Sequence, residues 1–366
     1  MKRPVAEDSM DPEPRSAVDP GTLPPGGSTL VAAVVRRTEP EGLAGPLPRV
    51  AIGGPEVVFA RIAPTIREGE ARLRALVGSD VDVVEAVGRY LVDAGGKRLR
   101  PMLTVLGAGV VGFCGDLSGL MCVGELIHLG SLLHDDVVDG AELRRNRPAA
   151  HIVYGNAATI LTGDFCLARA VLLAAEAGGH RAVTELARAV TAMAEGEVLQ
   201  LQRAGNLHTT LEHYLEMVDK KSAALIAWSA AAGAYAAGDD AAADALARFG
   251  RGVGVAFQIT DDVLDYAEGT GKLAGADLRE RKLTLPLVHA MLRIPGLRAR
   301  LEARAPTPAE LPALVAEIRA SGALEAALNE ARARVKAALA SLNALPPGPD
   351  RDSLAILGSY LVDRAT

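Results

Sequence analysis

The chain has 366 residues and a formal net charge of −6 at pH 7, so nucleic acid is not expected as its main partner. Hydrophobic residues make up 49 % of it and aromatic residues only 3 %, a composition that favours tightly packed helices over a β-sandwich. The three cysteines have no metal-ligand spacing, and we expect them to be free thiols of a cytoplasmic protein.

Residues 1–54 are predicted to be a disordered, proline-rich leader. Nine of the chain's 21 prolines lie within residues 1–50, among small and charged residues without periodicity. Such a segment cannot bury enough apolar surface to offset the entropy lost on ordering. It also lacks the apolar stretch of a signal peptide.

Residues 55–366 are predicted to form one all-α domain of about ten or more helices. Apolar residues recur at helical spacing, as at Leu311, Leu314 and Ile318, and no sustained alternation of period two appears. The longest uncharged run, residues 222–238, is shorter than the roughly 20 residues that a membrane span needs. We therefore interpret it as a buried helix and expect no integral membrane span.

Two copies of the pattern DDxxD lie in apolar, helical sequence. The aspartates are Asp135, Asp136 and Asp139 in the first copy and Asp261, Asp262 and Asp265 in the second. Like charges at positions i and i+4 destabilise a helix, and a hard divalent cation that takes carboxylate oxygens offsets this repulsion. One copy alone would be read as a solvated helix end. Two copies favour a cavity that holds cations.

Basic residues accompany both acidic motifs. In the segment GGKRLRP, Lys97 and Arg100 follow two glycines that let the backbone approach an anion closely. Arg144 and Arg145 follow the first acidic motif, and Lys272 and Lys282 follow the second. Together with metal-binding carboxylates, these cations indicate a phosphorylated substrate. A GxxxxGK[ST] loop is absent from the sequence, which excludes a P-loop nucleotide enzyme.

In combination, these motifs resemble the trans-isoprenyl diphosphate synthases, or polyprenyl synthetases. The segments that carry the resemblance are, in the family's order, GGKRLRP, ELIHLGSLLHDDVVDGAELRRNRP, LTGDF, GEVLQL, KSAAL, FQITDDVLDY and GKLAGADLRERKLTLP. The resemblance covers the chain from about residue 55 to its end. It implies a bundle of mostly antiparallel helices around a central cavity, usually as a homodimer.

The resemblance also implies a role for each charged position. Both aspartate triplets would hold Mg²⁺, three ions per active site with substrate bound, on the diphosphate of an allylic substrate. The positions that match contacts to that diphosphate are Arg144, Lys221, Gln258, Lys272 and Lys282. The positions that match contacts to isopentenyl diphosphate are Lys97, Arg100, His128 and Arg145. The residues expected to take part in catalysis are Asp135, Asp136, Asp139, Lys221, Asp261 and Asp262.

Two positions depart from the family pattern, since Asn146 and Arg281 stand where glycine is usual. Neither change removes a charged contact, so we expect tuning rather than loss of activity. His134 and His151 flank the first motif and are interpreted as structural.

Three other protein classes fit parts of the pattern. A class I terpene cyclase shares the fold and the first motif, but it would carry an Asn/Ser/Glu metal motif in place of the second. A non-catalytic subunit of a heteromeric prenyl synthase would have lost site residues, and none of the main ones is missing from the sequence. A di-iron bundle needs two Glu-x-x-His motifs, and Glu125 with His128 is a single instance.

The expected reaction is ionisation of the allylic diphosphate and attack on the carbocation by isopentenyl diphosphate. Product length should depend on the depth of an apolar tunnel below the first motif, where the chain has the small residues Gly130 and Ser131. These predict an open tunnel and a product of about C30 or longer, with a C20 product as the alternative. The other interpretation is that small residues allow close helix packing and that Ile127, Val171 or Leu172 forms the tunnel floor.

If Gly130 lines the tunnel, Gly130→Phe will shorten the product. Chromatography of the dephosphorylated products measures this, and an unchanged distribution of chain lengths would contradict the tunnel hypothesis.

Overall fold

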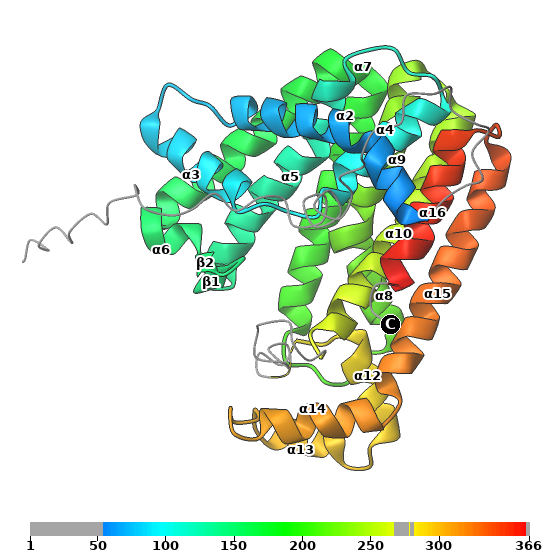
Figure 1. Ribbon diagram of the computed structural model, residues 1–366. Helices are drawn as coiled ribbons and strands as arrows, with labels where there is room; N and C mark the ends of the chain where they lie inside the picture. Colours follow the sequence, from blue (N-terminus) through cyan, green and yellow to red (C-terminus); the bar gives the residue numbers. More distant parts are fainter. Residues whose placement is uncertain (1–53, 267–277, 279–281, 364–366) are drawn as a thin grey trace, which may run out of the picture.

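A computed structural model describes residues 54–266, 278 and 282–363 as a bundle of helices (Figure 1). The predicted leader, apart from residue 54, lies outside the described residues, and so do Lys272 and Arg281. The predictions of an all-α fold and of ten or more helices are confirmed.

The first half of the chain contains α2 (Pro55–Leu76), α3 (Asp82–Asp93), α4 (Leu99–Val110), α5 (Leu117–Val138), β1 (Leu143–Arg144), β2 (Arg147–Pro148), α6 (Ala150–Tyr154) and α7 (Asn156–Arg203). The second half contains α8 (Leu211–Val218), a π-helical turn (Asp219–Ala223), α9 (Ala224–Ala237), α10 (Asp240–Leu264), α12 (Leu285–Arg293), α13 (Leu297–Ala303), α14 (Leu311–Ala320), α15 (Ala323–Ser341), a 3₁₀ turn (Leu342–Ala344) and α16 (Pro349–Asp363).

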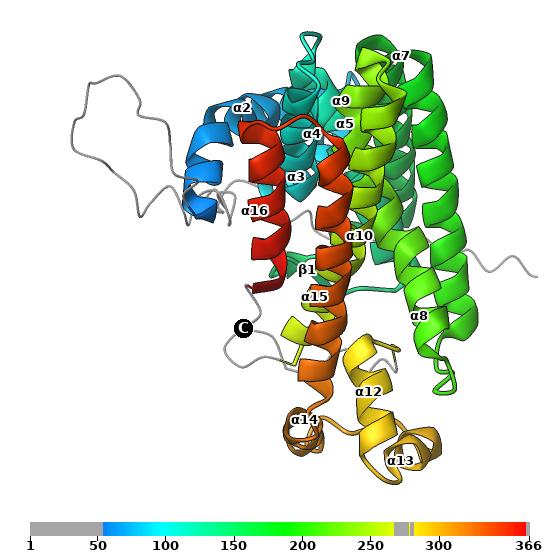
Figure 2. The same cartoon turned by 90° about the vertical axis from the view of Figure 1, so that its right-hand side faces the viewer.

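Helix α9 lies at the centre of the bundle. It packs against α4, α7 and α10, and Figure 2 shows it running between these long helices. All residues from Ala224 to Ala234 are buried, which confirms the buried helix that the uncharged run 222–238 predicts. A helix that is apolar on every side needs neighbours on every side, and its alanines let those neighbours approach.

Close helix crossings account for much of the small-residue content. At the crossing of α4 and α9, a side chain at Gly107 would overlap the carbonyl oxygen of Ala230, and one at Gly233 would overlap Ala108. Only glycine leaves this space to the neighbouring backbone. These contacts fix α4, and with it the GGKRLRP segment at its N-terminus, against the central helix.

Helices α5 and α7 pack along one another, and both are long and apolar enough to cross a membrane by length and composition alone. Most of α5 is buried in the protein core, whereas α7 keeps several apolar side chains exposed. The backbone of α7 is not a single straight helix, because Gly179 has a non-helical conformation (φ 71°, ψ −171°).

Helices α12, α13 and α14 lie together at one end of the long helices, as both views show (Figures 1 and 2). Arg319 of α14 donates through Nε to the carbonyl oxygen of Tyr266, over 2.6 Å. Tyr266 directly follows the second acidic motif, so this layer anchors the C-terminal end of α10.

We expect Gly107→Ala to destabilise the fold by about 1–3 kcal/mol, because the added methyl group forces α4 away from α9. Gly348→Ala is the matched control, since a methyl group there meets no atom within 4 Å. Urea unfolding measures both variants. Equal midpoints for Gly107→Ala and the unchanged protein would contradict the packing described.

Candidate active site

Each acidic motif lies at the C-terminal end of a long helix. Asp135 and Asp136 occupy the last turn of α5, and Asp139 is its C-cap residue. In the same way α10 ends at Leu264 with Asp265 as its C-cap. The C-terminal end of a helix is the negative end of its dipole, so carboxylates there are repelled by the helix as well as by each other. Both motifs therefore require nearby positive charge.

In the first motif, the positive charge comes from Arg144. The Asp136 carboxylate is fully buried, and its Oδ1 accepts hydrogen bonds from Nε of Arg144 at 2.7 Å and from Nη2. The other oxygen, Oδ2, is buried and accepts no hydrogen bond within the described part of the chain. Burial raises the pKa of Asp135 to about 6, against the opposing effect of the Lys221 charge.

The second motif is held by residues from two other segments and from α10 itself. Lys97 Nζ lies 2.8 Å from Asp261 Oδ1 and 4.9 Å from the centre of the Phe257 ring. Asp262 accepts hydrogen bonds from the hydroxyl of Tyr214 at 2.7 Å and from Nε2 of Gln258 at 2.9 Å. Lys97 thus joins the GGKRLRP segment to the second motif. No local sequence pattern could reveal this contact, because the two residues lie far apart in the chain.

Lys221 lies in the π-helical turn between α8 and α9. Its Nζ contacts Oε2 of Glu197 at 2.5 Å and Oε1 of Gln200 at 3.2 Å, both on α7. The approach is close because α7 has Gly196 there: a side chain at Gly196 would lie 2.5 Å from the backbone nitrogen of Lys221. π turns are rare in helices overall, but those that occur are often found at functional sites. Glu197 lies in the segment GEVLQL, which carries part of the family resemblance, but no local pattern there predicted its contact with Lys221.

Two sets of neighbouring residues lie between the surroundings of the two acidic motifs. On one side, the charge of Lys221 acts on Asp135, and the next residue, Ser222, donates to Gln258, which donates to Asp262. On the other side, the Arg145 guanidinium lies against Gly96, whose neighbour Lys97 pairs with Asp261. Lys282 is half-buried just before α12. The described residues predicted to bind the allylic diphosphate are therefore arranged around the two motifs, with Lys282 in the segment that follows the second.

A second cationic group lies beside the first motif. Arg100 Nε and Arg145 Nη1 are buried and make no hydrogen bond in the described residues. His128 is half-buried beside these arginines, and both desolvation and their charge hold its pKa well below its usual range. The imidazole is therefore neutral. Half-buried guanidinium groups whose buried donor atoms have no partner form a site that an anion would complete.

A short hairpin places the two arginines that follow the first motif. In the antiparallel pair β1–β2, Arg144 lies opposite Arg147, and the two residues between them have φ values of 53° (Arg145) and 62° (Asn146). Positive φ at both central positions is the type I′ turn, which glycine and asparagine favour. Asn146 thus meets the same backbone requirement as the glycine usual in the family.

The structure favours the packing interpretation of Gly130. A side chain there would lie 2.9 Å from the carbonyl oxygen of Gly163 on α7, so the space next to Gly130 is filled by backbone. Gly130→Phe would separate α5 from α7 and is not a clean test of product length. Ser131 is half-buried and donates to the carbonyl oxygen of His128, and its predicted role in chain length stays a prediction. Val171 and Leu172 are exposed on α7 and Ile127 is buried, and the tunnel floor stays a prediction.

The two flanking histidines have different surroundings. Nε2 of His134 lies 3.0 Å from the carbonyl oxygen of Ile160 and 3.3 Å from Asp164, so it joins α5 to α7 as a structural residue would. Nδ1 of His151 is buried and has no hydrogen-bond partner in the described residues.

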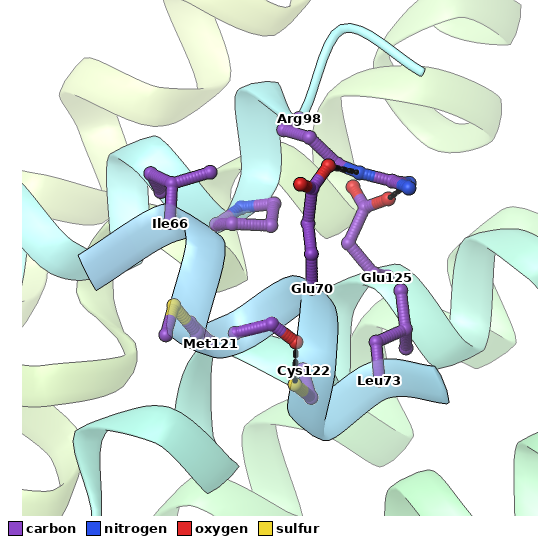
Figure 3. A pocket seen from close by; sticks show the side chains of 9 residues that line it. Ile66, Glu70, Leu73, Arg98, Met121, Cys122 and Glu125 are labelled. Atoms are coloured by element: carbon purple, nitrogen blue, oxygen red, sulfur yellow. Dashed lines mark hydrogen bonds and ion pairs between the residues drawn. The ribbon is translucent and has the colours of Figure 1, made fainter. Parts of the chain in front are cut away.

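Among residues 54–266, 278 and 282–363, no three carboxylate, thiol or imidazole side chains lie close enough together to hold a metal ion. Instead, Arg144 pairs with Oδ1 of Asp136, and Lys97 pairs with Oδ1 of Asp261. The two cavities described also lie elsewhere. One, of about 10 Å³, lies beside Arg98 (Figure 3), and the other is an open groove of about 660 Å³ beside α8. The central cavity stays a prediction.

The chain is a helical bundle with an aspartate triplet at the ends of two helices and arginines beside them, and its match to solved polyprenyl synthases gives it the isoprenoid synthase fold. A sequence model of the polyprenyl synthetase family matches residues 81–318. The octaprenyl diphosphate synthase of Haemophilus influenzae is 37 % identical over 311 residues, which cover 82 % of this chain and 94 % of that protein.

Solved structures agree. A polyprenyl synthase from Caulobacter crescentus, complexed with calcium and isoprenyl diphosphate, matches with a TM-score of 0.80 at 39 % identity and covers 87 % of this chain and 100 % of its own. A decaprenyl diphosphate synthase from Rhodobacter capsulatus matches with a TM-score of 0.79 at 36 % identity and covers 85 % and 99 %. The chain belongs to the polyprenyl synthetase family. The family prediction and the prediction of a prenyltransferase are confirmed.

The type I′ turn predicts the effect of changes at Asn146. Asn146→Val should destabilise the protein by about 1–3 kcal/mol, because a β-branched residue is strained at positive φ. Asn146→Gly should leave the stability within about 1 kcal/mol, since glycine adopts this conformation freely. Urea unfolding compares the two. A valine variant as stable as the glycine variant would contradict the turn.

Proposed function

We propose that the chain condenses isopentenyl diphosphate with an allylic diphosphate to give an all-trans polyprenyl diphosphate of C30 or longer. The observation that carries this proposal is the pair of adjacent anion sites: the cations around the two aspartate motifs, and the buried guanidinium donors of Arg100 and Arg145. One reactant would bind at each. The names of the matched relatives, octaprenyl and decaprenyl diphosphate synthases, support a long product.

The acidic side chains suit a hard divalent cation. All six are carboxylates at negative helix ends, and Asp136 Oδ2 is buried without a hydrogen-bond partner in the described residues. Oxygen ligands of this kind are those that Mg²⁺ prefers. We propose that both motifs hold Mg²⁺, three ions per active site with substrate bound. When bound, Mg²⁺ would supply charge stabilisation for the departing diphosphate.

The chain's own cations act on the same charge. Negative charge builds on the allylic diphosphate as its carbon–oxygen bond breaks, and cations fixed beforehand stabilise that state more than the ground state. Arg144 and Lys221 are held in position for this by Asp136 and Glu197. Arg100, Arg145 and neutral His128 would orient isopentenyl diphosphate, whose double bond attacks the carbocation. We assign no side chain as the base, because the released diphosphate can accept the proton.

We also propose that the protein is a homodimer. Helices α6 and α7 contact one another, and both expose apolar side chains; these are Ile152, Val153, Ile160, Leu161, Val171 and Leu172. Exposed apolar patches of this kind mark protein or membrane contacts. A second copy of the chain is the partner we assign, and a membrane contact would serve only the release of the apolar product.

The dimer proposal predicts that Leu161→Asp dissociates the protein. Leu161 is 63 % exposed on α7, and a buried charge in the interface would be strongly unfavourable. Leu292→Asp is the control, because Leu292 is 71 % exposed on α12, away from α7. Sedimentation equilibrium measures the mass. A monomeric parent protein, or an unchanged mass for Leu161→Asp, would contradict the proposed interface.

The proposed reaction is tested by incubating the purified full chain with Mg²⁺, labelled isopentenyl diphosphate and allylic primers of several lengths. Chromatography of the dephosphorylated products should show linear prenols of C30 or longer. A C20 end product would correct the chain length alone. Cyclic hydrocarbons, or no elongation with any primer, would contradict the proposed function.

We expect Asp136→Asn and Asp261→Asn each to lower the rate of condensation about 100-fold or more, because each removes a charge at the reacting diphosphate. Asp80→Asn is the control, since Asp80 is exposed in the loop before α3. Initial rates with labelled isopentenyl diphosphate measure the effect. Full activity in either motif variant would mean that its carboxylate takes no part in catalysis.

A further inference from the structure

We propose that Arg98 is a positioning residue that keeps Glu125 occupied, so that Arg100 and Arg145 stay available to the diphosphate of isopentenyl diphosphate. The inference rests on the proposed function. The sequence patterns gave neither Arg98 nor Glu125 a role in the site. Both lie next to residues that have one: Arg98 stands between Lys97 and Arg100, and Glu125 lies one helical turn before His128.

Arg98 is held from three directions. Its Nη1 donates to Glu125 Oε2 at 3.0 Å, and its Nε donates to Glu70 Oε1 at 3.0 Å. Its Nη2 lies 3.4 Å from the carbonyl oxygen of Val92. Figure 3 shows the two carboxylates, from α2 and α5, converging on the guanidinium group. Only 4 % of Arg98 and 4 % of Glu125 are exposed, so this is a buried ion pair.

The backbone of Arg98 supports a positioning role. It is left-handed, with φ 51° and ψ 30°, and it is the N-cap residue of α4. Residues other than glycine persist in this conformation where the surroundings fix it, and such residues are frequent at functional sites. The contacts to Glu70 and Glu125 supply that constraint. They thereby set the directions in which the neighbouring residues, Lys97 and Arg100, leave the turn.

The charges around Glu125 explain why its ion pair with Arg98 matters: without it, Glu125 would pair with Arg100 or Arg145. Burial lowers the pKa values of Arg100 and Arg145, and the Glu125 carboxylate acts in the opposite direction on both. Glu125 is thus within electrostatic reach of three guanidinium groups, yet its hydrogen bond is made to Arg98 alone in the described residues. Without Arg98, a buried carboxylate would need another partner, and Arg100 and Arg145 have unused buried donors.

The test compares Arg98→Met, Glu125→Gln and the double variant Arg98→Met/Glu125→Gln in the full chain. Arg98→Met should raise KM for isopentenyl diphosphate at least about tenfold and change KM for the allylic diphosphate less than about threefold. Glu125→Gln should leave both KM values within about threefold of those of the parent protein. The double variant should regain most of the loss, because the competing carboxylate is gone.

A purely structural ion pair predicts a different pattern, in which Arg98→Met affects both substrates alike and the double variant does no better. Either result would overturn the proposal, as would an unchanged KM in Arg98→Met. Arg74→Met is the matched control, since its pair with Asp93 at 2.9 Å is exposed and nearby in the chain. If Arg98→Met fails to fold, Arg98→Lys with and without Glu125→Gln decides by the same criteria, because lysine cannot reproduce the fork of hydrogen bonds.

Binding of inorganic pyrophosphate without added metal, measured by calorimetry, separates this inference from the proposed function. A parent protein that binds pyrophosphate but makes no prenyl product would contradict the function and leave the variants testable by binding. A parent protein that makes product while Arg98→Met binds pyrophosphate as tightly as the parent would contradict the inference alone.

Discussion

Like-charge repulsion at two helix ends is the constraint on which the site depends. Six carboxylates lie at the C-terminal ends of α5 and α10, where the helix dipole adds to their mutual repulsion. The chain offsets this with Arg144 on Asp136 and Lys97 on Asp261, both from segments outside these helices. If the site binds cations and a polyanion, these ion pairs must be able to exchange for them. A carboxylate whose oxygens were permanently paired could not bind a metal ion.

The acidic and basic halves of the site rest on different kinds of backbone. The carboxylates stand at the ends of regular helices, which the glycine and alanine crossings around α9 hold rigidly. The cations stand on irregular backbone: the left-handed turn at Arg98, the type I′ turn at Arg145 and the π turn at Lys221. Irregular backbone turns a side chain in a direction that a regular helix would not allow. We infer that these three turns aim the positive charge at the reactants.

Much of the fold followed from periodicity and composition, but the site followed only in part. Helical spacing and the alanine-rich run were enough to predict an all-α domain and the buried α9, whereas the bundle followed from the family resemblance. The acidic motifs were visible because their spacing of four is itself a helical feature. The pairs Lys221–Glu197, Asp262–Tyr214 and Arg98–Glu125 join residues far apart in the chain, so no local pattern could reveal them. Gly130 was ambiguous for a physical reason, since open space and close backbone packing both require a small residue.

We propose that both aspartate triplets hold metal ions on one diphosphate. A crystal structure of the chain with Mg²⁺ and an unreactive allylic diphosphate analogue tests it most directly. We expect ions that join carboxylates of α5 and of α10 to the same diphosphate, with Arg144 and Lys221 turned toward it. Ions confined to one triplet, or a diphosphate bound away from both, would contradict it.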